Sequence, residues 1–168
     1  MRALFFLLVL CLALPSLSCE ALDKKTQKRW QFWSVTLARL NPPYVWGDFD
    51  CSFTMNRIAE LSGVQGTTRT TANRMAKGLD GWKSVIITDA EKPGIQNPWD
   101  YKAPEAGDLC FWTNSKNRPY GHVGSHDGNG GICHASSSKG FTRILDNSSY
   151  GQKVIRVRRL TFGDKRYK

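Results

Sequence analysis

In the first third of the chain, apolar side chains recur at the spacing of a helix. Trp30, Trp33, Leu37 and Leu40 lie three or four residues apart, which is the period of one helix face. The pattern predicts a helix over residues 24–40 that buries this stripe against a core, and the Asn-Pro-Pro that follows ends it. A basic helix lying on a membrane surface is the alternative interpretation.

A second helix is predicted from residue 51 to about residue 61. Asp50 is placed to cap its first turn, and Gly63 is placed to end it. The positions of this helix that we expect to face inward are Cys51, Met55 and Ile58. This arrangement puts a cysteine at the very start of a helix.

The middle of the chain has a less regular pattern. A short third helix is predicted between a threonine cap near Thr70 and a stop at Gly78. Residues 79–104 are rich in glycine and proline, with one strand expected at residues 84–87. We interpret this stretch as a surface excursion and not as a domain boundary.

From Gly107 onward the pattern changes to short strands and turns. The predicted strand segments are "GDLCFW", "GHVGSH", "GICHAS", "GFTRIL" and "KVIRVRRL". Helices followed by a small antiparallel sheet define an α+β fold, with the N-terminal helices packed on the sheet. Residues 22–168 are long enough for one such domain and contain no internal repeat, so we expect a single domain and a monomer.

The N-terminus has the pattern of an export signal. One arginine precedes an apolar run from Ala3 to Leu14, which is followed by a proline and small residues. We expect residues 1–21 to be a signal peptide, or a lipoprotein signal that ends at an acylated Cys19. The apolar run is shorter than the ~20 residues of a spanning helix, so we expect no transmembrane segment after signal removal. The expected location is the periplasm, the cell envelope or the exterior.

The composition is strongly basic, with a formal net charge of +10 at pH 7. Such a charge favours anionic partners. An anionic cell-wall polymer is a partner of this kind, and we expect no nucleic acid partner. Charge by itself indicates nothing about the fold.

Outside the signal region the chain has an odd number of cysteines, namely Cys51, Cys110 and Cys133. In an oxidising compartment, Cys110 and Cys133 are the pair that we expect if a disulfide forms. Free thiols, buried as small apolar side chains, are the alternative.

Cys51 lies where a helix start favours an anionic sulfur. The positive end of the helix dipole and the unpaired N–H groups of the first turn stabilise a thiolate. We therefore expect the pKa of Cys51 to fall from about 8.5 into the range of roughly 3.5–7.5. The thiol is a candidate nucleophile.

A cysteine nucleophile needs a base, and the three histidines of the chain, His122, His126 and His134, lie close together in sequence. The segment predicts a hairpin whose turn is "DGNGG". If Gly124 pairs with His134, His122 becomes the diagonal neighbour of His134 on the same face. One imidazole then serves as base while the other orients it. His126 is expected to face solvent, and Ser136 is a weaker candidate for the orienting group.

Four segments together resemble the NlpC-type cell-wall cysteine peptidases, a branch of the papain-like fold. They are "PYVWGDFDCSF", "TTRTTANRMAKG", "PEAGDLCFW" and "YGHVGSHDGNGGICHAS", in the family's order over about residues 34–145. The resemblance implies that Cys51 is the nucleophile, that His122 is the general base and that His134 orients the base.

The same resemblance implies that Tyr44, Asp50 and Ser52 help to bind the substrate or its developing oxyanion. Two positions depart from the family pattern. Phe53 stands where the family usually has glycine after Asp-Cys-Ser, and Asp48 replaces the second glycine after the tryptophan. Neither change removes a catalytic side chain, so they put specificity in doubt more than activity.

The implied activity is hydrolysis of an amide in the peptide part of peptidoglycan, often the bond between D-glutamate and diaminopimelate. The thiolate attacks the carbonyl carbon, backbone N–H groups hold the oxyanion, and the base protonates the leaving amine before water releases the acyl-enzyme. No metal and no other cofactor is implied.

Three alternatives remain at this stage. The residues His122, His126, Cys133 and His134 have the atom types of a zinc site, although Cys133 is expected to face away from His134. A binding module for anionic polymer with an inactive thiol is favoured by Phe53. An acyltransferase that acts on lipids could use the same thiol and imidazole.

Overall fold

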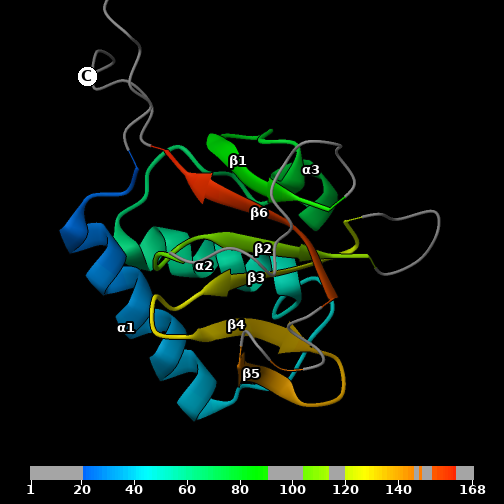
Figure 1. Cartoon of the computed structure of the whole chain (residues 1–168). Coiled ribbons are helices and arrows are strands. Elements are labelled where there is room, and N and C mark those ends of the chain that lie inside the picture. The colour runs from blue at the N-terminus through cyan, green and yellow to red at the C-terminus, as the bar shows by residue number, and fades with distance from the viewer. Residues whose placement is uncertain (1–20, 91–103, 114–119, 146–147, 149–152, 162–168) are drawn as a thin grey trace, which may run out of the picture.

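The computed structural model describes residues 21–90, 104–113, 120–145, 148 and 153–161 (Figure 1). Within these residues the helices come first and the strands follow, as the sequence pattern predicts. The helices are α1 (Lys24–Leu40), α2 (Cys51–Ser62) and α3 (Ala72–Ala76). The strands are β1 (Ser84–Asp89), β2 (Leu109–Trp112), β3 (His122–His126), β4 (Gly131–Ser136), β5 (Gly140–Leu145) and β6 (Val154–Leu160).

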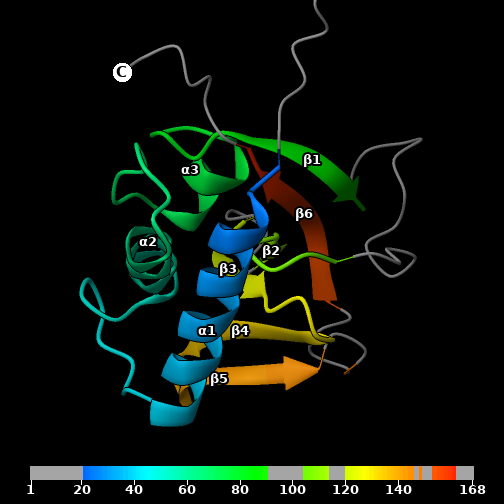
Figure 2. The ribbon, with the colours of Figure 1, turned by 90° about the vertical axis from the view of Figure 1, so that its left-hand side faces the viewer.

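The strands form a six-stranded sheet in the order β1-β6-β2-β3-β4-β5. Every neighbouring pair in this order is antiparallel. The helices lie across one face of the sheet, and Figure 2 shows α1 running across the strands. The α+β class predicted from the sequence is therefore confirmed.

Helix α1 has the predicted bounds. Asp23 caps its start by accepting a hydrogen bond of 2.8 Å from the backbone N–H of Thr26, and Asn41 ends it in a left-handed conformation. Trp30 is fully buried, but Leu40 is 72% exposed, so its predicted place in the buried stripe is wrong. Leu40 is the last helical residue, and the chain turns away there before it reaches the core.

Helix α2 follows the local signals of the sequence closely. The Asp50 side chain accepts a hydrogen bond of 2.8 Å from the N–H of Phe53, and Gly63 ends the helix at a φ of +87°. The three positions predicted to face inward are all buried. The first turn of α2 is thus fixed by its cap.

Two elements of the middle region differ slightly from the prediction. The cap of α3 is Thr71, one residue after the predicted position. Strand β1 is longer than predicted, because it pairs with β6 over Ser84–Asp89. Residues 91–103 of the predicted excursion lie outside the described residues.

The main core lies between the helices and the sheet, and a smaller cluster covers the other sheet face. Trp30 Nε1 donates a hydrogen bond of 2.9 Å to Ser125 Oγ in the core, which fastens α1 to β3. Cys133 belongs to the main core, whereas Cys110 belongs to the smaller cluster. Because these cysteines lie on opposite sheet faces, both are free, and the disulfide considered for them is wrong.

Among the described residues, no helix has the length and apolar character needed to cross a membrane. Residues 1–20, which carry the predicted signal, lie outside the described part of the chain.

Candidate active site

Cys51 is the first residue of α2, and the loop before it is tied to the same helix start. Asp50 accepts hydrogen bonds from the Gly47 N–H at 3.1 Å and from the Ser52 hydroxyl at 2.9 Å, in addition to its capping bond. The side chain of Arg69 donates to the Gly47 carbonyl from the other side. These hydrogen bonds hold the turn that carries the thiol in one conformation. Cys51 itself is only 8% exposed.

The histidines of β3 and β4 lie together as the predicted register requires. Gly124 pairs with His134 and His126 pairs with Ile132, which confirms the hairpin register. The Nε2 atom of His122 lies 3.0 Å from Nδ1 of His134, and the two ring planes are at 89°. Since one of these nitrogens must donate, the contact fixes the orientation of the His122 ring and leaves its Nδ1 free to meet another group.

Close packing around Gly124 holds the two rings in place. A Cβ atom at Gly124 would lie 2.8 Å from the Cys133 carbonyl oxygen and 2.9 Å from the His134 Cβ. The Trp112 ring packs against both imidazoles, with centroid distances of 5.1 Å to His122 and 5.7 Å to His134. Gly124 therefore leaves the room between the strands that the two rings need.

The protonation of Cys51 differs from the prediction. Burial raises the pKa of the Cys51 thiol to about 11, and the negative charge of Asp50 adds to this effect. Hydrogen bonds from the backbone N–H groups of Val123, Ser52 and Cys51 itself oppose the rise without reversing it. The expected low pKa of Cys51 is therefore wrong for the protein without substrate. The free-energy cost of burying a thiolate exceeds the stabilisation that the helix start gives it.

The histidines are also held neutral. Burial is the main cause that lowers the pKa of His122 to about 3, and the neighbouring His134 contributes to the same shift. Burial likewise lowers the pKa of His134 to about 4, with a contribution from Lys139. At neutral pH the site thus contains a neutral thiol and two neutral imidazoles, one of which can accept a proton.

A cleft of about 740 Å³ opens over the cysteine. Cys51 and His122 both line it, although no hydrogen bond joins them among the described residues. All three residues expected to bind substrate also line the cleft, namely Tyr44, Asp50 and Ser52. His134 is 3% exposed and lies behind His122, in keeping with an orienting position.

The sequence analysis did not identify several residues of this cleft. They include Trp46, Thr71, Asn73, Trp112, Tyr120 and Lys153. The sequence could have indicated Trp112, because this residue ends the predicted strand that precedes the histidine hairpin. In the structure Trp112 pairs with His122. The others come from the start of α3 and from separate loops, and no local pattern indicates that these segments meet.

Two secondary expectations about the hairpin need correction. His126 is buried at 3% exposure and its Nδ1 accepts a hydrogen bond of 3.0 Å from the Gly128 N–H, so it does not face solvent. The Ser136 hydroxyl lies 3.2 Å from the Ser138 hydroxyl, while His134 makes the contact to His122. In the part of the chain that the structure describes, no group of three His, Cys, Asp or Glu side chains is arranged to hold a metal ion.

This fold and this cleft define a papain-like domain with a cysteine at a helix start, and a comparison with protein families agrees. The model of the NlpC/P60 family matches residues 41–159, which is more than half of the chain. The protein belongs to the NlpC/P60 family, as its motifs predict. A comparison with curated proteins finds no match.

Solved structures of the same family have the same fold. NlpC1 from Trichomonas vaginalis is 21% identical with a TM-score of 0.60, covering 88% of this chain and 49% of that chain. A lipoprotein-like NLP/P60 protein from Staphylococcus aureus is 19% identical with a TM-score of 0.56, covering 88% and 45%. The peptidoglycan hydrolase RipB from Mycobacterium tuberculosis is 18% identical with a TM-score of 0.52, covering 84% and 70%. The chain spans about half the length of the first two proteins.

Proposed function

We propose that this protein is an exported cysteine peptidase that hydrolyses amide bonds in the stem peptides of peptidoglycan. The observation that carries the proposal is the pairing of Cys51, at the start of α2, with the His122–His134 contact at the same cleft. Membership of a family that includes a peptidoglycan hydrolase supports the choice of substrate. Residues 22–168 form the catalytic domain in this proposal, after a signal over residues 1–21.

The reaction begins from a neutral thiol in this proposal. His122 uses its free ring nitrogen to take the proton from Cys51 as the sulfur attacks the amide carbonyl carbon. His134 holds the His122 ring in position and stabilises the imidazolium that forms. The same proton then passes to the leaving amine, and water, activated by His122, releases the acyl group from the sulfur.

The oxyanion of this reaction would be held at the start of α2. The backbone N–H groups of Cys51 and Ser52 favour the ionised form of the sulfur, so they are suited to an oxyanion that forms beside it. Unpaired N–H groups of a helix's first turn are suited to developing negative charge. Tyr44, Asp50 and Ser52 are the proposed contacts for the rest of the substrate.

The cleft suits a peptide with polar and charged groups. Its lining includes several hydroxyl and amide side chains, one exposed tryptophan and the amino group of Lys153. A stem peptide presents free carboxylates and amides to such a surface. The bond between D-glutamate and diaminopimelate is the proposed cleavage site.

A binding module with an inactive thiol is the second candidate, and the high pKa of Cys51 is the observation that favours it. Phe53 favours it less than the sequence indicated. Arg69 lies over the Phe53 ring at 4.8 Å, and Phe53 is absent from the described lining of the cleft. The bulky side chain is thus accommodated beside the site and not in it.

The proposal is tested by digesting purified peptidoglycan of several chemical types and identifying the fragments by mass spectrometry. Wild type and Cys110→Ala, which alters a buried thiol outside the cleft, should release the same fragments. Cys51→Ala should release none. If wild type also releases no fragments from any wall type, the peptidase proposal fails and the binding module becomes the better account.

A further inference from the structure

The helix α1 has an unusual distribution of charge. Its 17 residues include five cations and no acidic side chain. The cations are Lys24, Lys25, Lys28, Arg29 and Arg39. A surface helix commonly gains stability from acidic residues placed three or four positions from its lysines, and α1 has none of these pairs.

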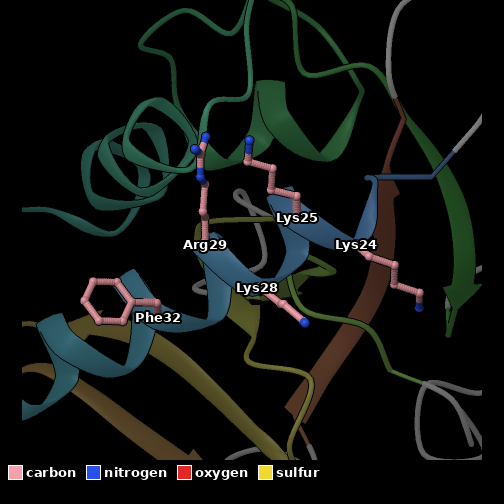
Figure 3. Close-up of a pocket in the computed structure, with 5 residues that line it drawn as sticks. All are labelled: Lys24, Lys25, Lys28, Arg29 and Phe32. Atoms are coloured by element: carbon pink, nitrogen blue, oxygen red, sulfur yellow. The ribbon is translucent and has the colours of Figure 1, made fainter.

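Four of the cations gather around one exposed aromatic ring. We call this group the basic face; it consists of Lys24, Lys25, Lys28, Arg29 and Phe32. At about 100° per residue, these side chains fall within an arc of about 140°, with Phe32 near its centre and the buried Trp30 on the opposite side. Lys25 and Arg29 extend to one side of the helix and the other two cations to the opposite side (Figure 3).

The basic face is open to solvent and hollowed. All four cations are exposed, and Phe32 is 59% exposed. The five side chains enclose a shallow hollow of about 430 Å³. A ligand group can therefore enter between the two rows of cations and contact the Phe32 ring.

Stability does not account for this arrangement. Cations in the first turns of a helix face the positive end of its dipole, which is an unfavourable placement. Among the described residues, none of the four cations forms an ion pair within 4 Å, and the attraction of Lys25 to the capping carboxylate of Asp23 offsets only part of the repulsion. Binding to an anion would remove this unfavourable energy.

We propose that the basic face binds a linear polyanion of the cell wall, a polymer of phosphodiester-linked polyol or sugar units. The two rows of cations along the helix suit the repeated charges of an extended chain. The Phe32 ring suits contact with the face of a polyol or sugar unit that lies between two charged groups of that chain. This choice of occupant rests on the proposed function, which places the substrate in the wall. Bound there, the polymer would hold the cleft close to stem peptides.

Other anionic occupants fit the basic face less well. Phe32 is its only apolar side chain. Trp30 is buried in the core, and Trp33, whose ring meets the Phe32 ring edge-on at 5.1 Å, packs partly against the same core, so little apolar surface is available to enter a bilayer. Single-stranded nucleic acid is usually held by successive aromatic rings, and the basic face has one.

The test measures binding of the full chain to purified poly(glycerol phosphate) at several salt concentrations. The test variant is Lys24→Gln/Lys25→Gln/Lys28→Gln. Its matched control, with the same change of charge at scattered exposed lysines, is Lys77→Gln/Lys83→Gln/Lys139→Gln. We expect the test variant to bind the polymer at least tenfold more weakly than wild type. The magnitude of the slope of log K against log salt should fall by about 2 in this variant. The affinity of the control variant should stay within about twofold of wild type.

Equal losses in the two variants, or no loss in either, would overturn the proposal. Tighter binding of phosphatidylglycerol vesicles or of single-stranded DNA than of the polymer would overturn the choice of occupant. Every measurement is made in a Cys51→Ser background, so binding is read without hydrolysis. A failure of the peptidase proposal, seen as absent fragments, is therefore a separate result from a failure of this one.

Discussion

Acid should destabilise the protein through the two histidines that face each other across β3 and β4. Burial lowers the pKa of His122 to about 3 and that of His134 to about 4, both below the value near 6.5 expected in the unfolded chain. At pH values between these folded-state pKa values and 6.5, the unfolded state binds more protons than the folded state. Stability must therefore fall as the pH falls through this window.

The size of the loss follows from the displaced pKa values. Each pH unit below 6.5 costs about 1.4 kcal/mol for every histidine that stays neutral in the folded state. At pH 4.5 both rings are still largely neutral in the folded protein. Two pH units and two histidines then give a loss of roughly 5 kcal/mol, which is a large part of the ~5–15 kcal/mol that stabilises a typical domain.

Urea unfolding at pH 7.5 and at pH 4.5, followed by tryptophan fluorescence, measures this loss. The control is the double variant His122→Gln/His134→Gln, in which the rings cannot take up protons while carboxylates titrate as before. We expect wild type to lose about 5 kcal/mol more than the double variant between the two pH values. Equal losses in the two proteins would show that the histidines are not held neutral by burial, and the reasoning would be refuted.

Three further predictions concern the packing and the thiol. Gly124→Ala should lower the free energy of unfolding by about 1–3 kcal/mol, because the added methyl would lie 2.9 Å from the His134 Cβ. Thermal unfolding measures this loss, and an unchanged melting temperature would contradict the prediction. Asp89→Asn should cost about 3–5 kcal/mol in urea unfolding, because Arg156 donates two buried hydrogen bonds to Asp89; a loss below about 1 kcal/mol would count against this pair. The alkylation rate of Cys51 by iodoacetamide should keep rising above pH 9, since its pKa is raised to about 11; a plateau below pH 7 would instead indicate a thiolate–imidazolium pair.

The parts of the site that were predictable from the sequence are those with local signals. Asp50 and Gly63 mark the ends of α2, because a cap and a stop act within one turn of the helix they limit. The hairpin register follows from the glycine-rich turn, which leaves few ways to pair the strands on either side. The position of Cys51 at the start of α2 and the neighbouring positions of His122 and His134 were therefore predictable from the sequence.

The parts that were not predictable depend on contacts between distant segments. The neighbours of Trp112 are set by its pairing with β3 and β6, and neither pairing has a local signature. The pKa of Cys51 depends on how deeply the sheet and the loops bury the thiol, so the helix start alone gave the wrong direction. Leu40 matched the apolar stripe of α1, but its burial required a core that does not extend to the helix end.

Cys51 and His122 act as one catalytic unit in the proposed reaction, and a double-mutant comparison of kcat/KM on a stem-peptide substrate measures whether they do. Wild type, Cys51→Ala, His122→Ala and the double variant are compared under the same conditions. We expect each single substitution to remove nearly as much activity as the double substitution, because thiol and imidazole perform the same step together. Losses in the single variants that simply add in the double variant, or a Cys51→Ala protein within about tenfold of wild type, would contradict it.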